Sequence, residues 1–155
     1  LFASYWLMPL DDYRKQVTAT VDLDLLGHCA ERYGVSLTAA ILKWLQYTEE
    51  KAVLVMSRDG FMNWAWSSEP ASKAGAFFRT RNNVIAVPNG SLAANAEING
   101  ERAGTQIPAS IWFPHASADT PLREMKIHAE QYGVVLTLLH LPRSASVWPP
   151  WAAEE

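Results

Sequence analysis

The sequence predicts an α+β protein in which a helical N-terminal segment precedes a mostly antiparallel sheet with one or two helices. Apolar residues recur at helical spacing up to about residue 49, and from Ala52 the pattern changes to the two-residue period of strands. Over 155 residues, 49% hydrophobic and 19% charged residues are typical of a globular chain and exclude a disordered one. We therefore divide the chain into a helical unit, residues 1–50, and an α+β unit, residues 51–155.

Charge and cysteine content narrow the classes of partner. A formal net charge of −3 disfavours binding to nucleic acid or to an anionic membrane, because both require clustered positive charge. The single cysteine, Cys29, cannot form an internal disulfide, so nothing indicates secretion. The apolar run 1–10 follows no basic segment and is too short to span a bilayer. We expect a cytoplasmic chain without a membrane partner and, since Leu1 opens within a helical pattern, part of a longer protein.

Helices are predicted throughout the first unit. Pro9 ends the first, because proline disfavours helix at the residue before it. Asp22 can cap a second helix that ends at Gly34, and Ser36 can cap a third that ends near Glu49. The last two helices form a hairpin of the helix-turn-helix type.

A DNA-binding role for this hairpin is an alternative that the residues disfavour. A recognition helix needs side chains that read base edges, whereas Lys43 is the only cation near the start of the third helix. Residues 1–51 also contain five basic against seven acidic side chains, which provides little attraction for phosphates. A packed helical hairpin is therefore the favoured interpretation.

The second unit is expected to contain several antiparallel hairpins. Segments with strand character are 52–56, 61–66, 75–80, 109–113, 122–130 and 134–141, and Ser91 can cap a short helix to about residue 98. Alternation places Met62, Trp64 and Trp66 on one face of their strand. In 122–130, Met125 and Ile127 alternate with charged residues, so that one face of the strand is expected to be buried and the other exposed to solvent.

Two pieces of the first unit carry a family resemblance. Phe2-Ala3-Ser4-Tyr5-Trp6-Leu7-Met8-Pro9, followed by Tyr33-Gly34-Val35-Ser36, resembles the ImmA/IrrE family of zinc-dependent metallopeptidases, whose members often cleave transcriptional repressors. The resemblance covers about residues 1–48. The family binds zinc through His-Glu-x-x-His and an upstream acidic residue, and neither is found here, because none of the four histidines begins that motif.

The resemblance therefore implies the C-terminal portion of such a peptidase. By itself the chain is expected to be inactive, with no catalytic residue, no metal ligand and no cofactor of its own. Zinc would belong to the intact protein, and the missing N-terminal peptidase part would be a partner. Family members of the IrrE type carry a C-terminal domain similar to GAF sensor domains, so residues 51–155 are expected to be a GAF-like sensor or regulatory domain that binds a small molecule or mediates dimer contacts.

Candidate ligand-binding residues in the second unit are aromatic and basic. Ligand pockets are largely aromatic with a few placed polar groups, and arginine binds anions through paired hydrogen bonds. The candidates are Trp64, Trp66, Phe77, Phe78, Arg79, Arg81 and Trp112. The alternative is that the tryptophans fill the core of the sheet and the arginines are solvated.

The C-terminal tail is unusually apolar. Val147-Trp148-Pro149-Pro150-Trp151 contains two aromatic residues around a Pro-Pro pair, which favours an extended conformation. The tail can pack back on the sheet, form a homodimer contact, or dock on the missing peptidase part. A protein-interaction or dimerisation module is therefore a further functional alternative.

Overall fold

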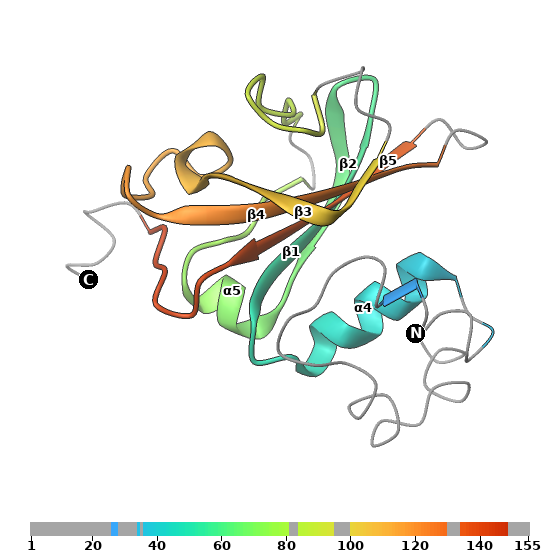
Figure 1. Cartoon of the computed structure of the whole chain (residues 1–155), viewed down its shortest axis with the longest axis horizontal. Helices are drawn as coiled ribbons and strands as arrows, with labels where there is room; N and C mark the ends of the chain where they lie inside the picture. Colours follow the sequence, from blue (N-terminus) through green and yellow to red (C-terminus); the bar gives the residue numbers. More distant parts are fainter. Residues whose placement is uncertain are drawn as a thin grey trace.

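The computed structural model describes residues 26–27, 34, 36–80, 84–94, 100–129 and 134–148. Within these residues the chain forms a five-strand antiparallel sheet in the order β2-β1-β5-β4-β3 (Figure 1). Its elements are α4 (Leu37–Tyr47), β1 (Lys51–Arg58), β2 (Phe61–Ser67), α5 (Glu69–Lys73), β3 (Gly100–Pro108), the 3-10 turn η1 (Ala109–Ile111), β4 (Pro121–Ala129) and β5 (Val134–Leu141). The α+β class with an antiparallel sheet and two helices is confirmed.

The hairpin of β1 and β2 forms where the sequence predicts it, with one difference in its faces. The turn residues Asp59 and Gly60 both have positive φ, 53° and 84°, as two-residue hairpin turns require. A register shift follows Met56, so that Met62 lies opposite Ser57 and packs on the face away from Trp64. The expectation that Met62 shares a face with the tryptophans is therefore wrong.

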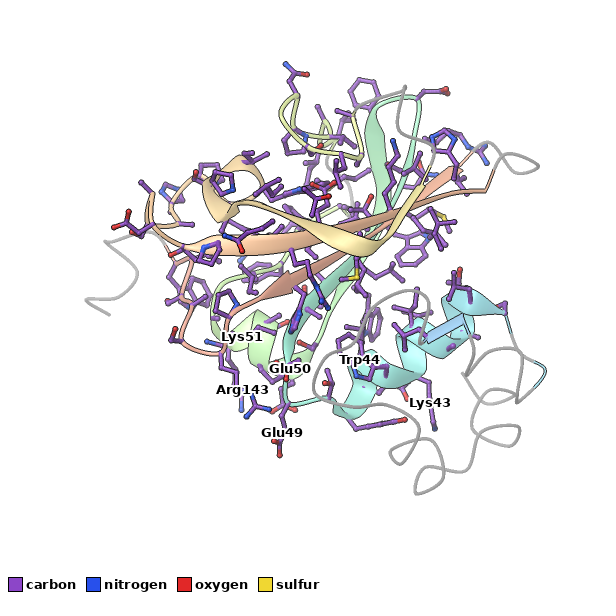
Figure 2. The ribbon with its side chains drawn as sticks, viewed as in Figure 1. Lys43, Trp44, Glu49, Glu50, Lys51 and Arg143 are labelled. Atoms are coloured by element: carbon purple, nitrogen blue, oxygen red, sulfur yellow. The ribbon has the colours of Figure 1, made fainter. Side chains whose placement is uncertain are left out.

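Helix α4 covers one face of the sheet. Ser36 caps it as predicted, since its hydroxyl accepts a hydrogen bond from the Ala39 amide at 3.1 Å. Ile41, Trp44 and Leu45 pack against apolar residues of β1, β4 and β5, and Figure 2 shows Trp44 between the helix and the sheet. Because these contacts hold the apolar side of α4 on the sheet, a recognition-helix role is not favoured. Most of the helical hairpin predicted upstream lies outside the described residues.

The opposite face of the sheet is covered by the connection between β2 and β3 together with the tail. Figure 1 shows the segment 84–94 on the side of the sheet away from α4. The core on this face also includes Ala71 of α5, Ala109 of η1, Ala145 and Val147. Glu124 and Lys126 point to this face and are fully buried. The expectation that this face of β4 is exposed to solvent is therefore wrong, because the long connection between β2 and β3 folds over the face.

Four local features also differ from what the sequence predicts. β3 (100–108) was not predicted, because its sequence has no apolar alternation. The apolar run 109–113 begins as η1 rather than a strand, since the amides of Trp112 and Phe113 both bond the Ala109 carbonyl. Residues 76–80 form no strand after α5, and Ser91 caps only a turn, bonding the Ala94 amide at 3.2 Å; the helix expected beyond it lies outside the described residues.

None of the helices in the described ranges combines the length and the apolar content needed to cross a bilayer. The longest helical segment there, α4, has 11 residues and packs against the sheet. A bilayer-spanning helix needs about 20 apolar residues.

Replacing Ser68 by alanine is expected to lower the free energy of unfolding by about 1–3 kcal/mol. Its buried hydroxyl accepts from the Ala52 amide at 3.1 Å, caps α5 through the Ala71 amide and donates to the Glu50 carbonyl at 2.7 Å. Urea unfolding measures the loss. Ser72→Ala, at an exposed position of the same helix, is the control and should change stability by less than ~0.5 kcal/mol. Equal effects of the two substitutions would contradict this role.

Candidate functional site

A pocket of about 330 Å³ opens between the segment after α5, the turn around η1 and the tail. Its walls are mainly aromatic and its rim carries two nitrogen-bearing side chains, Arg79 and His115. The lining residues are Gly75, Phe77, Phe78, Arg79, Trp112, Phe113, Pro114, His115, Val147 and Trp148. Its volume lies in the range of small-molecule pockets, which is about 300–1,000 Å³.

The aromatic walls are fixed by contacts between their rings. Phe78 stacks on Phe113 with ring centroids 5.2 Å apart and meets Trp112 edge-on at 5.9 Å. On the other side of the pocket Phe77 meets Trp148 edge-on at 5.6 Å. Such pairs favour defined ring orientations, so the apolar surface of the pocket is formed before any ligand arrives.

Arg79 provides a positive charge at the rim. Its guanidinium carbon lies 5.5 Å from the centroid of the Phe77 ring, a cation–π distance, and the side chain is exposed. His115 also lines the pocket and is exposed. A stacked guanidinium keeps its hydrogen-bond donors in a plane that suits a carboxylate or a phosphate. The pocket therefore combines apolar walls with an anion-binding group.

The tail closes one side of the pocket by packing back on the chain. The Val147 amide donates to the Ala74 carbonyl at 2.8 Å, and the Trp148 indole donates to the Lys73 carbonyl at 2.7 Å. Gly75, with φ of +89°, makes room for the indole, because a Cβ there would lie 2.8 Å from a Trp148 ring carbon. Trp148 keeps 39% of its surface exposed, and Trp151 lies outside the described residues.

Trp112 connects this pocket to a buried acid. Its indole nitrogen donates to Glu124 Oε1 at 3.0 Å, and Glu124 Oε2 accepts from the Ala93 amide at 2.9 Å. Two residues along β4, Lys126 Nζ donates to the Leu92 carbonyl at 2.8 Å. The buried acid and base thus hold residues 92 and 93 against the sheet through charge-assisted hydrogen bonds.

Burial also affects the pKa of Lys126. Desolvation lowers the pKa of its ammonium group, and the negative charge of Glu124 opposes that shift. Thr137 is its cross-strand partner and is fully buried, and its hydroxyl has no hydrogen-bond partner among the described residues. The interior beneath residues 92 and 93 is therefore polar at its centre.

The structure brings some of the candidate ligand residues together and separates others. Phe77, Phe78, Arg79 and Trp112 line the aromatic pocket. Trp64 packs toward the α4 side of the sheet, and Trp66, which is 47% exposed, lies on the same face of β2, so neither lines it. Arg81 lies outside the described residues. The other wall residues were not candidates, because Phe113, His115 and Trp148 reach the pocket only through the fold of η1 and the tail.

The described residues offer no donor set for zinc. Among them, no group of three or more His, Cys, Asp or Glu side chains is arranged to hold a metal ion. His28 and Cys29 lie outside this part of the chain. The zinc that the family resemblance implies for the intact protein therefore has no fitting set of ligands among the residues described.

Trp112→Phe is expected to reduce the free energy of unfolding by about 1–3 kcal/mol, because it leaves one oxygen of a buried carboxylate without its donor. The ring is retained, so the loss reports the hydrogen bond more than the packing. Trp66→Phe, on the exposed part of β2, is the matched control and should have a much smaller effect. Urea unfolding of both variants provides the comparison, and a similar loss in each would argue against a structural role of the indole–carboxylate bond.

Raising the pH is expected to stabilise the native chain relative to Lys126→Met. Between the lowered pKa of the folded state and the ordinary 10.5, the unfolded chain binds a proton that the folded chain does not. Unfolding then takes up a proton, so the contribution of Lys126 to the free energy of unfolding rises with pH in that window and is constant below it. Urea unfolding of both proteins from neutral pH to 10.5 tests this. A difference that is independent of pH, or that falls, would refute it.

The sequence matches no protein-family model and no curated protein. An aromatic cavity with a cation at its rim, as in the pocket described above, is characteristic of sites for small organic anions.

Proposed function

We propose that residues 51–155 form a regulatory domain that senses a small organic anion in the aromatic pocket. The observation that carries this proposal is the position of Arg79 at the rim of a cavity whose walls are stacked rings. The rings provide contact area for a flat apolar body, and the guanidinium provides paired donors for a carboxylate or phosphate. The expected ligand is therefore an aromatic or otherwise planar acid.

Trp112 gives such a ligand a route to the rest of the domain. The indole is a wall of the pocket and also the donor that holds one oxygen of Glu124, whose other oxygen holds the Ala93 amide. A ligand that moves the Trp112 ring changes the hydrogen bonds of Glu124 and, through them, the position of residues 92 and 93 against the sheet. Ligand binding can then favour one position of this segment over another, which is the physical basis of a regulatory response.

We further propose that the chain is the regulatory portion of an ImmA/IrrE-like zinc metallopeptidase that cleaves a transcriptional repressor. The two sequence pieces at 2–9 and 33–36 support the family, and the antiparallel sheet that follows α4 is compatible with a GAF-like sensor domain. In this proposal the partner of the sensor is the N-terminal peptidase part, which holds the zinc. Nucleic acid is not an expected partner, because α4 directs its apolar residues to the sheet.

The sensor proposal predicts selective binding of planar acids. 2-Naphthoate should raise the melting temperature of the protein in a saturable manner. 2-Naphthamide, which has the same rings and no charge, should bind at least about 10-fold more weakly. Arg79→Gln should remove most of this preference, because it deletes the charge-assisted hydrogen bonds at the rim. Thermal-shift titration and quenching of tryptophan fluorescence measure both effects.

Arg58→Gln is the charge-matched control, since Arg58 is exposed at the end of β1 and does not line the pocket. It should bind 2-naphthoate as the native chain does. If neither aromatic compound binds, or if Arg79→Gln retains the preference for the acid, the pocket is not an anion sensor. A dimerisation module would then be the better function, with Trp148 as its exposed aromatic contact.

A further inference from the structure

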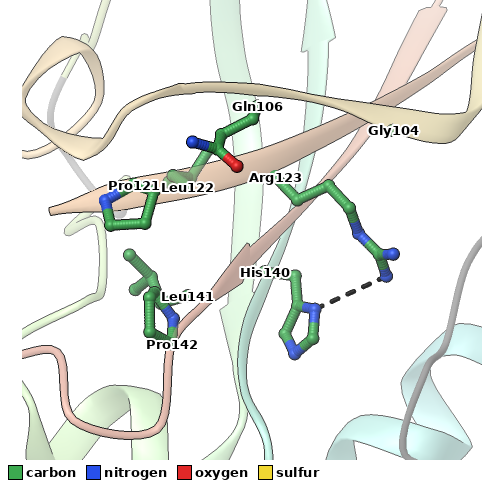
Figure 3. Close-up of a pocket in the computed structure, with 8 residues that line it drawn as sticks. All are labelled: Gly104, Gln106, Pro121, Leu122, Arg123, His140, Leu141 and Pro142. Atoms are coloured by element: carbon green, nitrogen blue, oxygen red, sulfur yellow. Dashed lines mark hydrogen bonds between the residues drawn. The ribbon is translucent and has the colours of Figure 1, made fainter.

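A second pocket, of about 360 Å³, lies at the end of the sheet where β1 begins (Figure 3). Its polar wall is a cross-strand row, because Gln106 of β3 pairs with Arg123 of β4, which in turn pairs with His140 of β5. Its apolar surface comes from Pro121 and Pro142, which are half-exposed. It shares no lining residue with the aromatic pocket.

A buried carboxylate orients the polar wall. Glu50 is only 9% exposed, and its Oε2 lies 3.3 Å from His140 Nε2. On the other side of the imidazole, His140 Nδ1 lies 3.5 Å from Arg123 Nη2, the contact drawn in Figure 3. One neutral tautomer, with the proton on Nε2, satisfies both contacts: Nε2 donates to Glu50, and Nδ1 accepts from Arg123. The imidazole therefore links the carboxylate to the guanidinium and limits the rotation of both.

The backbone of β3 also fits the Arg123 side chain. Gly104 has φ of +99° and lies at the register shift between Glu101 and Thr105. A Cβ at position 104 would lie 2.5 Å from Arg123 Cγ, so a side chain there would displace the arginine. Arg123 is thus positioned by the packing of its aliphatic stem against Gly104 as well as by its contact with His140.

A second arginine lies at this end of the sheet. Arg143 Nη2 lies 3.3 Å from Glu50 Oε1, so Glu50 faces His140 with one oxygen and Arg143 with the other. Figure 2 shows Glu50 and Arg143 close together near the start of β1. Arg123 and Arg143 thus place two guanidinium groups around His140 and Glu50. Since both imidazole nitrogens already have partners, the arrangement is suited to binding rather than to proton transfer.

We propose that this pocket binds the oxyanion of a small amphipathic acid, either a carboxylate or a phosphate monoester with a short apolar chain. The Arg123 guanidinium and the Gln106 amide supply hydrogen-bond donors to the oxygens. Pro121 and Pro142, which are half-exposed, supply apolar contact for the chain. This ligand differs from that of the aromatic pocket, because it needs no ring, and its site stands independently of the sensor proposal.

The test is a titration of the full chain with hexanoate, hexyl phosphate, inorganic phosphate and hexanol, followed by amide chemical shifts. Saturable binding of hexanoate or hexyl phosphate, with shifts at residues 104–106, 140 and 141, supports the proposal. The tighter of the two identifies the headgroup. Inorganic phosphate should bind at least about 10-fold more weakly than hexyl phosphate, because it lacks the apolar part, and hexanol should not bind there.

Arg123→Gln should weaken the binding of the preferred acid by about 10-fold or more. Arg123→Lys keeps the charge but loses the planar fork, so its affinity for the acid should lie between those of Arg123→Gln and the native chain. It replaces Arg123→Gln as the test if that variant does not fold. Arg58→Gln is the control, because Arg58 does not line this pocket, and it should bind as the native chain does. No saturable binding of either acid, shifts confined to other residues, or native affinity in both Arg123 variants would overturn the proposal.

Discussion

Seven residues of β1 pair in antiparallel register with β5, from Lys51 opposite Leu141 to Ser57 opposite Val135. This pairing joins the β1–β2 hairpin to the C-terminal strands β4 and β5. Its alternation divides the interior in two. Ala52 and Leu54 face α4, whereas Val53 and Val55 face the connection between β2 and β3. A slip of one residue would exchange these faces, because side chains alternate along a strand. The same pairing brings the start of β1 to the end of β5, and therefore Glu50 to His140.

Much of the sheet could be predicted from local signals, and the failures share one cause. The β1–β2 hairpin is marked by Asp59-Gly60 between apolar runs, and β5 by its own apolar run. By contrast, the burial of Glu124 and Lys126 depends on a segment more than 30 residues away that folds over them. No periodicity within β4 reports such a cover, so a two-residue alternation of charge was interpreted as a solvent-facing side.

The candidate sites show the same limit. Composition alone singled out Phe77, Arg79 and Trp112, because aromatic and basic residues are recognisable types in a sequence. The row of Gln106, Arg123 and His140 has no sequence signature, since its members are neighbours only through the register of three strands. Knowledge of that register, or of the reason for a glycine at position 104, is needed before the second pocket can be recognised.

The strand order has a consequence for synthesis. β1 lies inside the sheet, next to the edge strand β2, yet its other neighbour, β5, is the last of the described strands to leave the ribosome. Until then the apolar residues of β1 have a partner strand on one side only, and β4 and β5 must arrive before either core can close. Pairing between segments so far apart in sequence is slow, and an open apolar edge is prone to association during that delay. The nascent chain is thus most vulnerable to aggregation after β2 has formed and before β5 is complete.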